Sequence, residues 1–185
     1  MGEGFVSAEK ANIADLDERI AIFSDDTRDT VKGSVFYGEI PGYVNGKSGL
    51  EEKVKSVVCA WCDGGHPFSP KSPRQIISYI SAHDNYTLWD KLVLTMKKEA
   101  DYSAKDKRLL KANKLAAAII FTSKGIPFIQ AGEEFARTKY GDGNSYHSPV
   151  GINKLDWKRR EEYSGLVEYY KGLYELRQAF SGFYD

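Results

Sequence analysis

Residues 76–85 read IISYISAHDN, a short apolar run that gives way abruptly to polar residues. Two comparable runs flank it, RIAIF at residues 19–23 and IPFIQA at residues 126–131, and polar residues soon follow each of them. Short, largely apolar runs of this kind are typical of strands buried in a parallel sheet. The sequence therefore predicts three parallel strands, each leading into a polar segment.

Helices are predicted between these strands. Residues 48–51 (SGLE) have the spacing of a capping box, and apolar residues recur after them at helical spacing. Thr87 and Ser103 are candidate N-caps of two further helices, and residues 166–174 carry the apolar stripe of a last one. Because strands and helices alternate, we expect parallel strands joined by right-handed crossovers.

This pattern leaves two architectures open. One is a small α/β domain. The other is a piece of a (β/α)8 barrel, since a complete barrel takes roughly 250 residues and this chain has 185. In such barrels the loops after the strands build the active site. Residues 135–156 are rich in Gly, Pro and Ser and follow the third predicted strand, so they are a candidate site loop.

Composition excludes several classes of function. Lys plus Arg and Asp plus Glu each number 26, so no charge excess indicates nucleic acid or an anionic membrane as a partner. No apolar run approaches the roughly 18 residues of a membrane-spanning helix. Residues 1–5 lack the basic start and apolar stretch of a signal peptide. These features leave the localisation of the protein open.

Cys59 and Cys62, in the order C-A-W-C, admit a functional and a structural interpretation. The spacing suits a redox pair, a thiol switch or half of a zinc site. A structural zinc site, however, needs about four ligands, and the chain contains no second cysteine pair. We therefore expect buried structural thiols, and neither a metal nor a cofactor.

His83, Asp84 and Asn85 follow the second predicted strand and are expected to project into a mouth at the carboxyl edge of the sheet. An aspartate accepts hydrogen bonds from sugar hydroxyls, a histidine ring nitrogen donates one, and a carboxylate stabilises a developing oxocarbenium ion. Alternatively, Asp84 or Asn85 simply begins a helix-capping turn. The residues alone do not decide between a sugar site and a cap.

Residues 81–92 (SAHDNYTLWDKL) resemble the fourth signature region of the α-amylase superfamily, glycoside hydrolase family 13, in its pullulanase form. In that family this region follows the seventh strand of the catalytic barrel. Segments similar to the sixth strand, the eighth strand and their loops appear in the family's order at residues 23–29, 31–36, 41–46, 125–139, 144–149 and 153–157. The resemblance extends from about residue 20 to about residue 180.

The resemblance implies an α/β fold in which residues 1–185 are the C-terminal part of a catalytic (β/α)8 TIM barrel, with about three βα units holding strands six to eight. It implies a retaining glycoside hydrolase of starch and glycogen debranching, which cleaves α-1,6-glucosidic bonds in pullulan and branched α-glucans without a cofactor. The expected partner is an α-glucan oligosaccharide or polysaccharide. The expected parent is a bacterial cytoplasmic or secreted protein.

The resemblance also assigns roles to individual residues. Asp84 matches the aspartate that stabilises the transition state, and His83 matches the histidine that hydrogen-bonds a hydroxyl of the sugar at the cleavage point. Asn85 is expected to contact the substrate. Asp26 and Arg28 are expected to support substrate binding within a charge network that orients the site, the alternative being a solvated turn.

Members of this family carry the nucleophile after the fourth strand and the acid/base after the fifth. Glu3, in the segment GEGF, resembles the acid/base region, although Phe5 replaces the usual Trp. No segment resembles the strand that carries the nucleophile. A retaining mechanism needs two carboxyl groups ~5 Å apart, so we expect the isolated chain to be inactive. The alternative function is that of a non-catalytic α-glucan-binding module.

Three further expectations concern structure. Trp89, inside a predicted helix, is expected to pack beneath the site rather than to bind sugar. Glu134 and Arg137 are expected to form a structural ion pair at helical spacing. Three strands alone would leave open edges and an uncovered face. We therefore expect either self-association through those edges or an adapted packing in which helices cover the open face.

Overall fold

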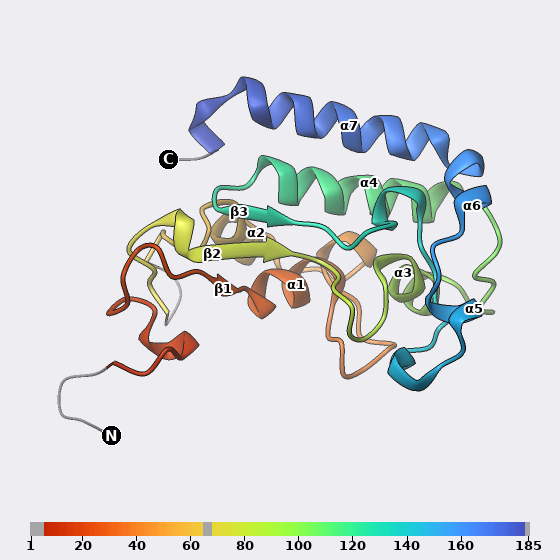
Figure 1. Cartoon of the computed structure of the whole chain (residues 1–185), viewed down its shortest axis with the longest axis horizontal. Coiled ribbons are helices and arrows are strands. Elements are labelled where there is room, and N and C mark those ends of the chain that lie inside the picture. Colours follow the sequence, from red (N-terminus) through yellow and green to blue (C-terminus); the bar gives the residue numbers. More distant parts are fainter. Residues whose placement is uncertain (1–5, 65–67, 184–185) are drawn as a thin grey trace.

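The computed structural model describes residues 6–64 and 68–183. At its centre lies a sheet of three parallel strands in the order β1 (Ile22–Phe23), β2 (Ile76–Tyr79) and β3 (Ile126–Phe128) (Figure 1). Ile77 of the central strand lies opposite Phe23 on one side and Ile126 on the other. The predicted strands and their parallel direction are thus confirmed, and each strand is shorter than its apolar run.

Seven α-helices accompany the sheet within the described residues. They are α1 (Asp25–Lys32), α2 (Glu51–Val58), α3 (Leu88–Met96), α4 (Lys107–Thr122), α5 (Val150–Asn153), α6 (Trp157–Glu162) and α7 (Ser164–Ala179). Helix α4 contacts β3, α3 and α7, and Figure 1 shows it between the sheet and α7. The predicted α/β class is therefore confirmed.

Helix α1 occupies residues for which the sequence predicts a charged loop. Ser24 is its N-cap, because the hydroxyl oxygen accepts the N–H of Thr27 at 3.2 Å. Two aspartates in the first turn interact favourably with the positive end of the helix dipole. Sequence periodicity misses this helix because Val31 is the one hydrophobic residue among its buried positions, the others being threonines and a lysine.

The N-caps of the other helices include one confirmed prediction and two corrections. Thr87 caps α3, as predicted. Helix α4 is capped by Asp106 rather than Ser103, because the Asp106 carboxylate accepts two N–H groups of the first turn. Helix α2 begins without a side-chain cap, because Leu50 occupies its N-cap position and the predicted capping box at residues 48–51 does not form.

One face of the sheet packs against the helices. Ile76 and Ile80 are 2% and 1% exposed and belong to one core cluster with side chains of α1, α2, α3, α4 and α7. Trp89 of α3 is also in this cluster and packs edge to face against Tyr163, with ring centroids 5.4 Å apart. The predicted packing role of Trp89 is therefore confirmed.

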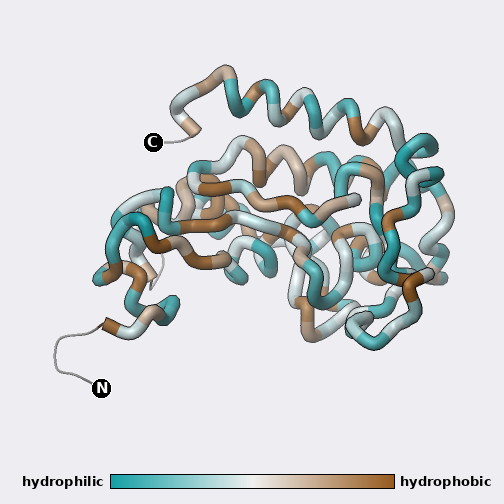
Figure 2. The backbone as a smooth tube through the Cα atoms, viewed as in Figure 1, coloured by the Kyte–Doolittle hydropathy of each residue, from teal (hydrophilic) through white to brown (hydrophobic). Residues whose placement is uncertain are grey.

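The opposite face of the sheet is open. Phe23, Ile126 and Phe128 are 46%, 44% and 37% exposed, and the rings of Phe23 and Phe128 meet edge to face at 5.1 Å. Figure 2 shows the hydrophobic character of all three strands. Among the described residues, the helices leave these side chains exposed, so the expected adapted packing is wrong. Self-association stays a prediction.

The two cysteines follow α2 and are free thiols. Cys59 is half-buried and Cys62 is exposed, so the predicted burial of both is wrong. Ala60 and Trp61 have left-handed φ angles of 52° and 59°, and this turn buries their side chains while Cys62 stays outside.

Within residues 6–64 and 68–183, no cluster of three or more His, Cys, Asp or Glu side chains is arranged to hold a metal ion. None of the described helices has the length and apolar character to cross a membrane.

Candidate functional site

The segment between β2 and α3, residues 80–87, is a loop beyond the carboxyl end of the central strand. Its base is buried, with Ser81 at 0% and Thr87 at 2% exposure. Its tip carries the side chains of His83 and Asp84, which are 91% and 72% exposed. Nε2 of His83 and Oδ2 of Asp84 lie 3.3 Å apart. A strand and a helix thus present an imidazole and a carboxylate side by side to solvent.

Asn85 turns this loop back toward α3. Its φ angle of 62° lies in the left-handed region, which asparagine tolerates better than most residues. Helix α3 is capped by Thr87, so neither Asp84 nor Asn85 serves as its N-cap. The first turn of this helix does not use the Asp84 carboxylate, and the alternative that Asn85 only begins the turn leading to the cap stays open.

A cavity of about 310 Å³ opens beside His83. His83 and Phe128 line it together with Arg137, Lys139 and Asn153 from the segment after β3. The candidate site loop after the third strand therefore meets the loop that carries His83. A larger cavity of about 530 Å³ lies against β3, α4 and α7, and neither His83 nor Asp84 lines it.

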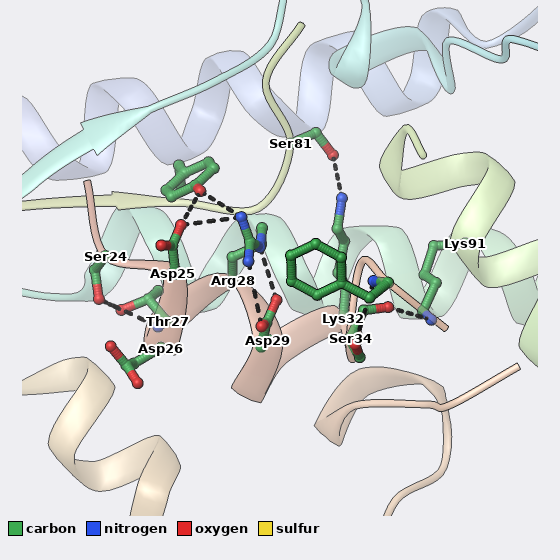
Figure 3. Close-up of polar contacts among 12 residues, drawn as sticks. Ser24, Asp25, Asp26, Thr27, Arg28, Asp29, Lys32, Ser34, Ser81 and Lys91 are labelled. Atoms are coloured by element: carbon green, nitrogen blue, oxygen red, sulfur yellow. Dashed lines mark hydrogen bonds and ion pairs between the residues drawn. The ribbon is translucent and has the colours of Figure 1, made fainter. Parts of the chain in front are cut away.

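Two buried lysines contact the 80–87 loop from different elements. Nζ of Lys32, in α1, donates to the Tyr86 carbonyl at 2.8 Å. It also donates to the Ser81 hydroxyl at 3.4 Å (Figure 3). Nζ of Lys139, after β3, donates to the His83 carbonyl at 2.6 Å. The backbone on both sides of Asp84 is therefore bound to an ammonium group.

Arg28 lies in a charge network at the start of α1 (Figure 3). Its guanidinium donates to Asp25 at 2.9 Å, to Asp29 at 2.7 Å and to the Tyr79 hydroxyl at 2.8 Å. The Tyr79 hydroxyl donates to Asp25 at 2.6 Å. Burial, followed by this bond to Asp25, raises the pKa of Tyr79 well above its usual value. The network therefore links α1 to the last residue of β2.

Asp26 points away from Arg28 in Figure 3, and its carboxylate pairs with Nζ of Lys10 at 2.8 Å. Nζ of Lys10 also lies 3.6 Å from the carboxylate of Asp25, which Arg28 binds, so Asp26 is connected to the Arg28 network through Lys10. A substrate contact by Asp26 or Arg28 stays a prediction. Glu3 lies outside the described residues, so its acid/base role also stays a prediction.

Glu134 and Arg137 bind backbone groups in place of the predicted ion pair. The Glu134 carboxylate accepts the Gly132 N–H at 3.0 Å, and the Arg137 guanidinium donates to the Asn153 carbonyl at 2.6 Å. Helical spacing does not apply here, because a single 3-10 turn ends at left-handed Ala136.

Glu133 and Lys32 are buried titratable side chains that no sequence pattern signals. Burial raises the pKa of Glu133 to about 8, and the Lys32 charge opposes this shift. Burial lowers the pKa of Lys32 to about 7, which the Glu133 charge opposes in turn. The Tyr170 hydroxyl also lies 3.2 Å from Oε1 of Glu133. Lys32, which contacts the 80–87 loop, and Glu133 are therefore titratable although both are shielded from solvent.

Comparisons with known proteins come from sequence and from structure. No family model matches the chain. A pullulanase of Bacillus subtilis (strain 168) is 39% identical over 166 residues, which cover 89% of this chain and 22% of that protein. An isoamylase of Flavobacterium sp is 27% identical over 127 residues, covering 59% of this chain and 16% of that protein.

Solved structures give the same result. A pullulanase from Anoxybacillus sp. LM18-11, crystallised with maltotriose, superposes with a TM-score of 0.84 at 38% identity, over 95% of this chain and 24% of that one. A mutant pullulanase from Paenibacillus barengoltzii, complexed with maltotetraose, gives 0.81 at 39% identity, over 90% of this chain and 25% of that one. This chain is therefore related in sequence and fold to the pullulanase-type debranching enzymes of glycoside hydrolase family 13, and it spans about a quarter of their length.

Proposed function

We propose that this chain is the sixth-to-eighth βα portion of the catalytic (β/α)8 barrel of a pullulanase-type enzyme, and that it presents His83 and Asp84 to an α-glucan. The observation that carries the proposal is the position of this pair. It is exposed at the carboxyl end of a buried parallel strand, beside a cavity, in a chain related to pullulanases. Loops at this end of the strands form the active site of β/α barrels.

The proposed reaction is hydrolysis of α-1,6-glucosidic bonds in pullulan or branched α-glucans with retention of configuration. Its transition state resembles an oxocarbenium ion, which a nearby carboxylate stabilises. Asp84 takes that role, since its side chain is 72% exposed and available to a ligand. His83 donates a hydrogen bond to a hydroxyl of the same sugar, and Asn85 contacts the substrate from the same tip.

The isolated chain is proposed to be inactive. A retaining mechanism needs a nucleophile and an acid/base ~5 Å apart in addition to the stabilising carboxylate. The carboxylates of Asp25 and Asp29 near the sheet edge are bound to the Arg28 guanidinium, which makes them poor nucleophiles. A polypeptide that supplies the nucleophile would have to accompany this chain, whereas Glu3 is the proposed acid/base.

A reducing-sugar assay with pullulan tests the proposal. We expect no release above that of an Asp84→Ala preparation purified in parallel. Release by the unaltered chain that disappears in Asp84→Ala would contradict the proposed inactivity and would still support the site.

A second candidate is a non-catalytic α-glucan-binding module, which the exposed pair beside its cavity also favours. Affinity separates the two functions. A self-sufficient module is expected to bind maltotriose with a Kd of roughly micromolar order, whereas an incomplete barrel site is expected to bind it at roughly millimolar order or more weakly. Isothermal titration calorimetry distinguishes these ranges.

We further propose that the chain associates with itself or with complementary polypeptide through the open side of the sheet. Exposed Phe23, Ile126 and Phe128 form an apolar surface there, and β1 and β3 each pair with β2 alone in the described sheet. Unpaired strand edges invite pairing with another chain. Sedimentation velocity over a range of concentrations tests this association.

A further inference from the structure

Two lysines beneath the His83–Asp84 tip are almost inaccessible to solvent. Lys32 and Lys139 are 1% and 2% exposed. Burying an ammonium group is unfavourable unless hydrogen bonds and opposite charges compensate for the lost water. In both cases a backbone carbonyl of the 80–87 loop is among the compensating groups, Tyr86 for Lys32 and His83 for Lys139.

The backbone of Lys139 is itself fixed to α3. Asp90, at 0% exposure, accepts the Lys139 N–H at 2.8 Å and also accepts the hydroxyl of Thr138. Asp90 belongs to the first turn of α3, the helix that Thr87 caps directly after the loop. The main chain of Lys139 is thus bound to α3 while its side chain crosses to the loop after β2.

The charges around Lys139 include the site residue itself. Burial lowers the pKa of Lys139, and Arg137 acts in the same direction. The carboxylates of Asp90, Asp142 and Asp84 oppose that shift. The ammonium of Lys139 is therefore held by the backbone of one residue of the pair and lies within electrostatic reach of the carboxylate of the other.

We propose that Lys139 is a positioning residue for the His83–Asp84 pair, which it orients by binding the His83 carbonyl from the loop after β3. Lys32 holds the far side of the same loop at Tyr86. The inference rests on the proposed function, because orientation of the pair matters for a sugar that the pair binds. It adds a link between two loops of the site, through a residue that need not touch the substrate.

Lys91 provides a matched comparison. It is also 0% exposed, and its Nζ donates to the carbonyls of Ser34, Tyr37 and Gly38 at 2.6–2.9 Å. These carbonyls belong to the segment after α1, so Lys91 holds a different loop in the same manner. Removing its charge should disturb that segment and leave the tip at His83 in place.

Backbone ¹⁵N relaxation in Lys139→Met, Lys139→Arg and Lys91→Met tests the proposal. Methionine keeps the length of the apolar stem and removes the charge, and arginine restores the charge. We expect Lys139→Met to lower the amide order parameters at residues 82–86 to below about 0.6, while core amides of α4 keep theirs. Lys139→Arg should restore part of this order, and Lys91→Met should lower the order parameters at residues 34–40 instead.

Unchanged order parameters at residues 82–86 in Lys139→Met would overturn the proposal, as would an equal decrease there in Lys91→Met. If Lys139→Met does not fold, Lys139→Arg alone decides, because its bulkier guanidinium cannot reproduce the 2.6 Å contact of Nζ and should loosen residues 82–86 moderately. Maltotriose titration of the same proteins separates the positioning role of Lys139 from the proposed glucan site. Lower order parameters in Lys139→Met, without any sugar binding by the unaltered chain, would retain the positioning role and reject the glucan site.

Discussion

The two faces of the sheet differ sharply. On the helical face Ile76 is 2% exposed and shares a core with five helices, whereas on the other face Phe23 and Phe128 are 46% and 37% exposed. The helical face is therefore buried like a protein core, whereas the open face leaves apolar side chains exposed to solvent. Stability should come from the first face, and association from the second.

Substitution on the helical face is expected to have the largest effect. Trp89 is 1% exposed and contacts Tyr163 and the Arg159 guanidinium. Trp89→Ala should lower the free energy of unfolding by about 3–5 kcal/mol, because it removes a large buried side chain and leaves a cavity. Urea denaturation followed by circular dichroism measures this. Trp157→Ala, at a position 64% exposed, is the control and should cost less than about 1 kcal/mol.

The buried titratable groups Glu133 and Lys32 predict an effect of pH on stability. The folded-state pKa of Glu133, about 8, lies above the ordinary value of 4.5. Its contribution to stability is therefore complete below pH 4.5 and is lost as the pH rises through 8. The folded-state pKa of Lys32, about 7, lies below its ordinary value of 10.5. Lys32 therefore makes stability rise with pH, but only above pH 7. Between pH 5 and pH 7 the loss due to Glu133 should prevail.

Glu133→Gln should remove this loss, because glutamine does not ionise. From pH 5 to pH 7 the unaltered chain should lose stability relative to Glu133→Gln by up to about 1.4 kcal/mol per pH unit, the limit for one proton. Urea denaturation across this range gives the difference, with Glu134→Gln as the control at a half-buried neighbour. Parallel pH profiles of the unaltered chain and Glu133→Gln would show that Glu133 is already ionised when buried.

Substitution on the open face should change stability least. Phe128→Ser removes a partly exposed ring and should lower the free energy of unfolding by only about 1 kcal/mol, yet it should shift sedimentation toward the monomer. Phe36→Ser, at a loop position 80% exposed, is the control and should leave association unchanged. If Phe128→Ser instead destabilises the chain as much as Trp89→Ala, the contrast between the faces is wrong.

The sequence predicted the parts of the fold that depend on apolar patterning. The three isoleucine-containing runs became strands, and Thr87 capped α3 as its position indicated. Helix α1 was not predicted because its buried positions are threonines and a lysine beside one valine. Burial of Cys59 and Cys62 was wrongly expected, because a left-handed turn at Ala60 interrupts the helical spacing on which the expectation rested.

The site was predictable at its tip and unpredictable at its base. His83 and Asp84 are neighbours in the sequence, so predicting the strand before them was enough to locate both side chains. Lys32 and Lys139 lie 54 and 56 residues from the carbonyls that they bind, in segments whose local sequence reads as charged surface. Contacts of that range depend on how strands and helices pack, which residue spacing does not encode.

The most direct test of the account is a maltotriose titration of the ¹⁵N-labelled chain, read from the amide resonances. We expect saturable shifts concentrated at residues 82–86, weak in affinity and abolished by Asp84→Ala, which should leave the rest of the spectrum unchanged because its side chain is 72% exposed. Absence of any shift at these residues, or saturable binding that survives Asp84→Ala, would contradict the assignment of this strand end to a glucose unit.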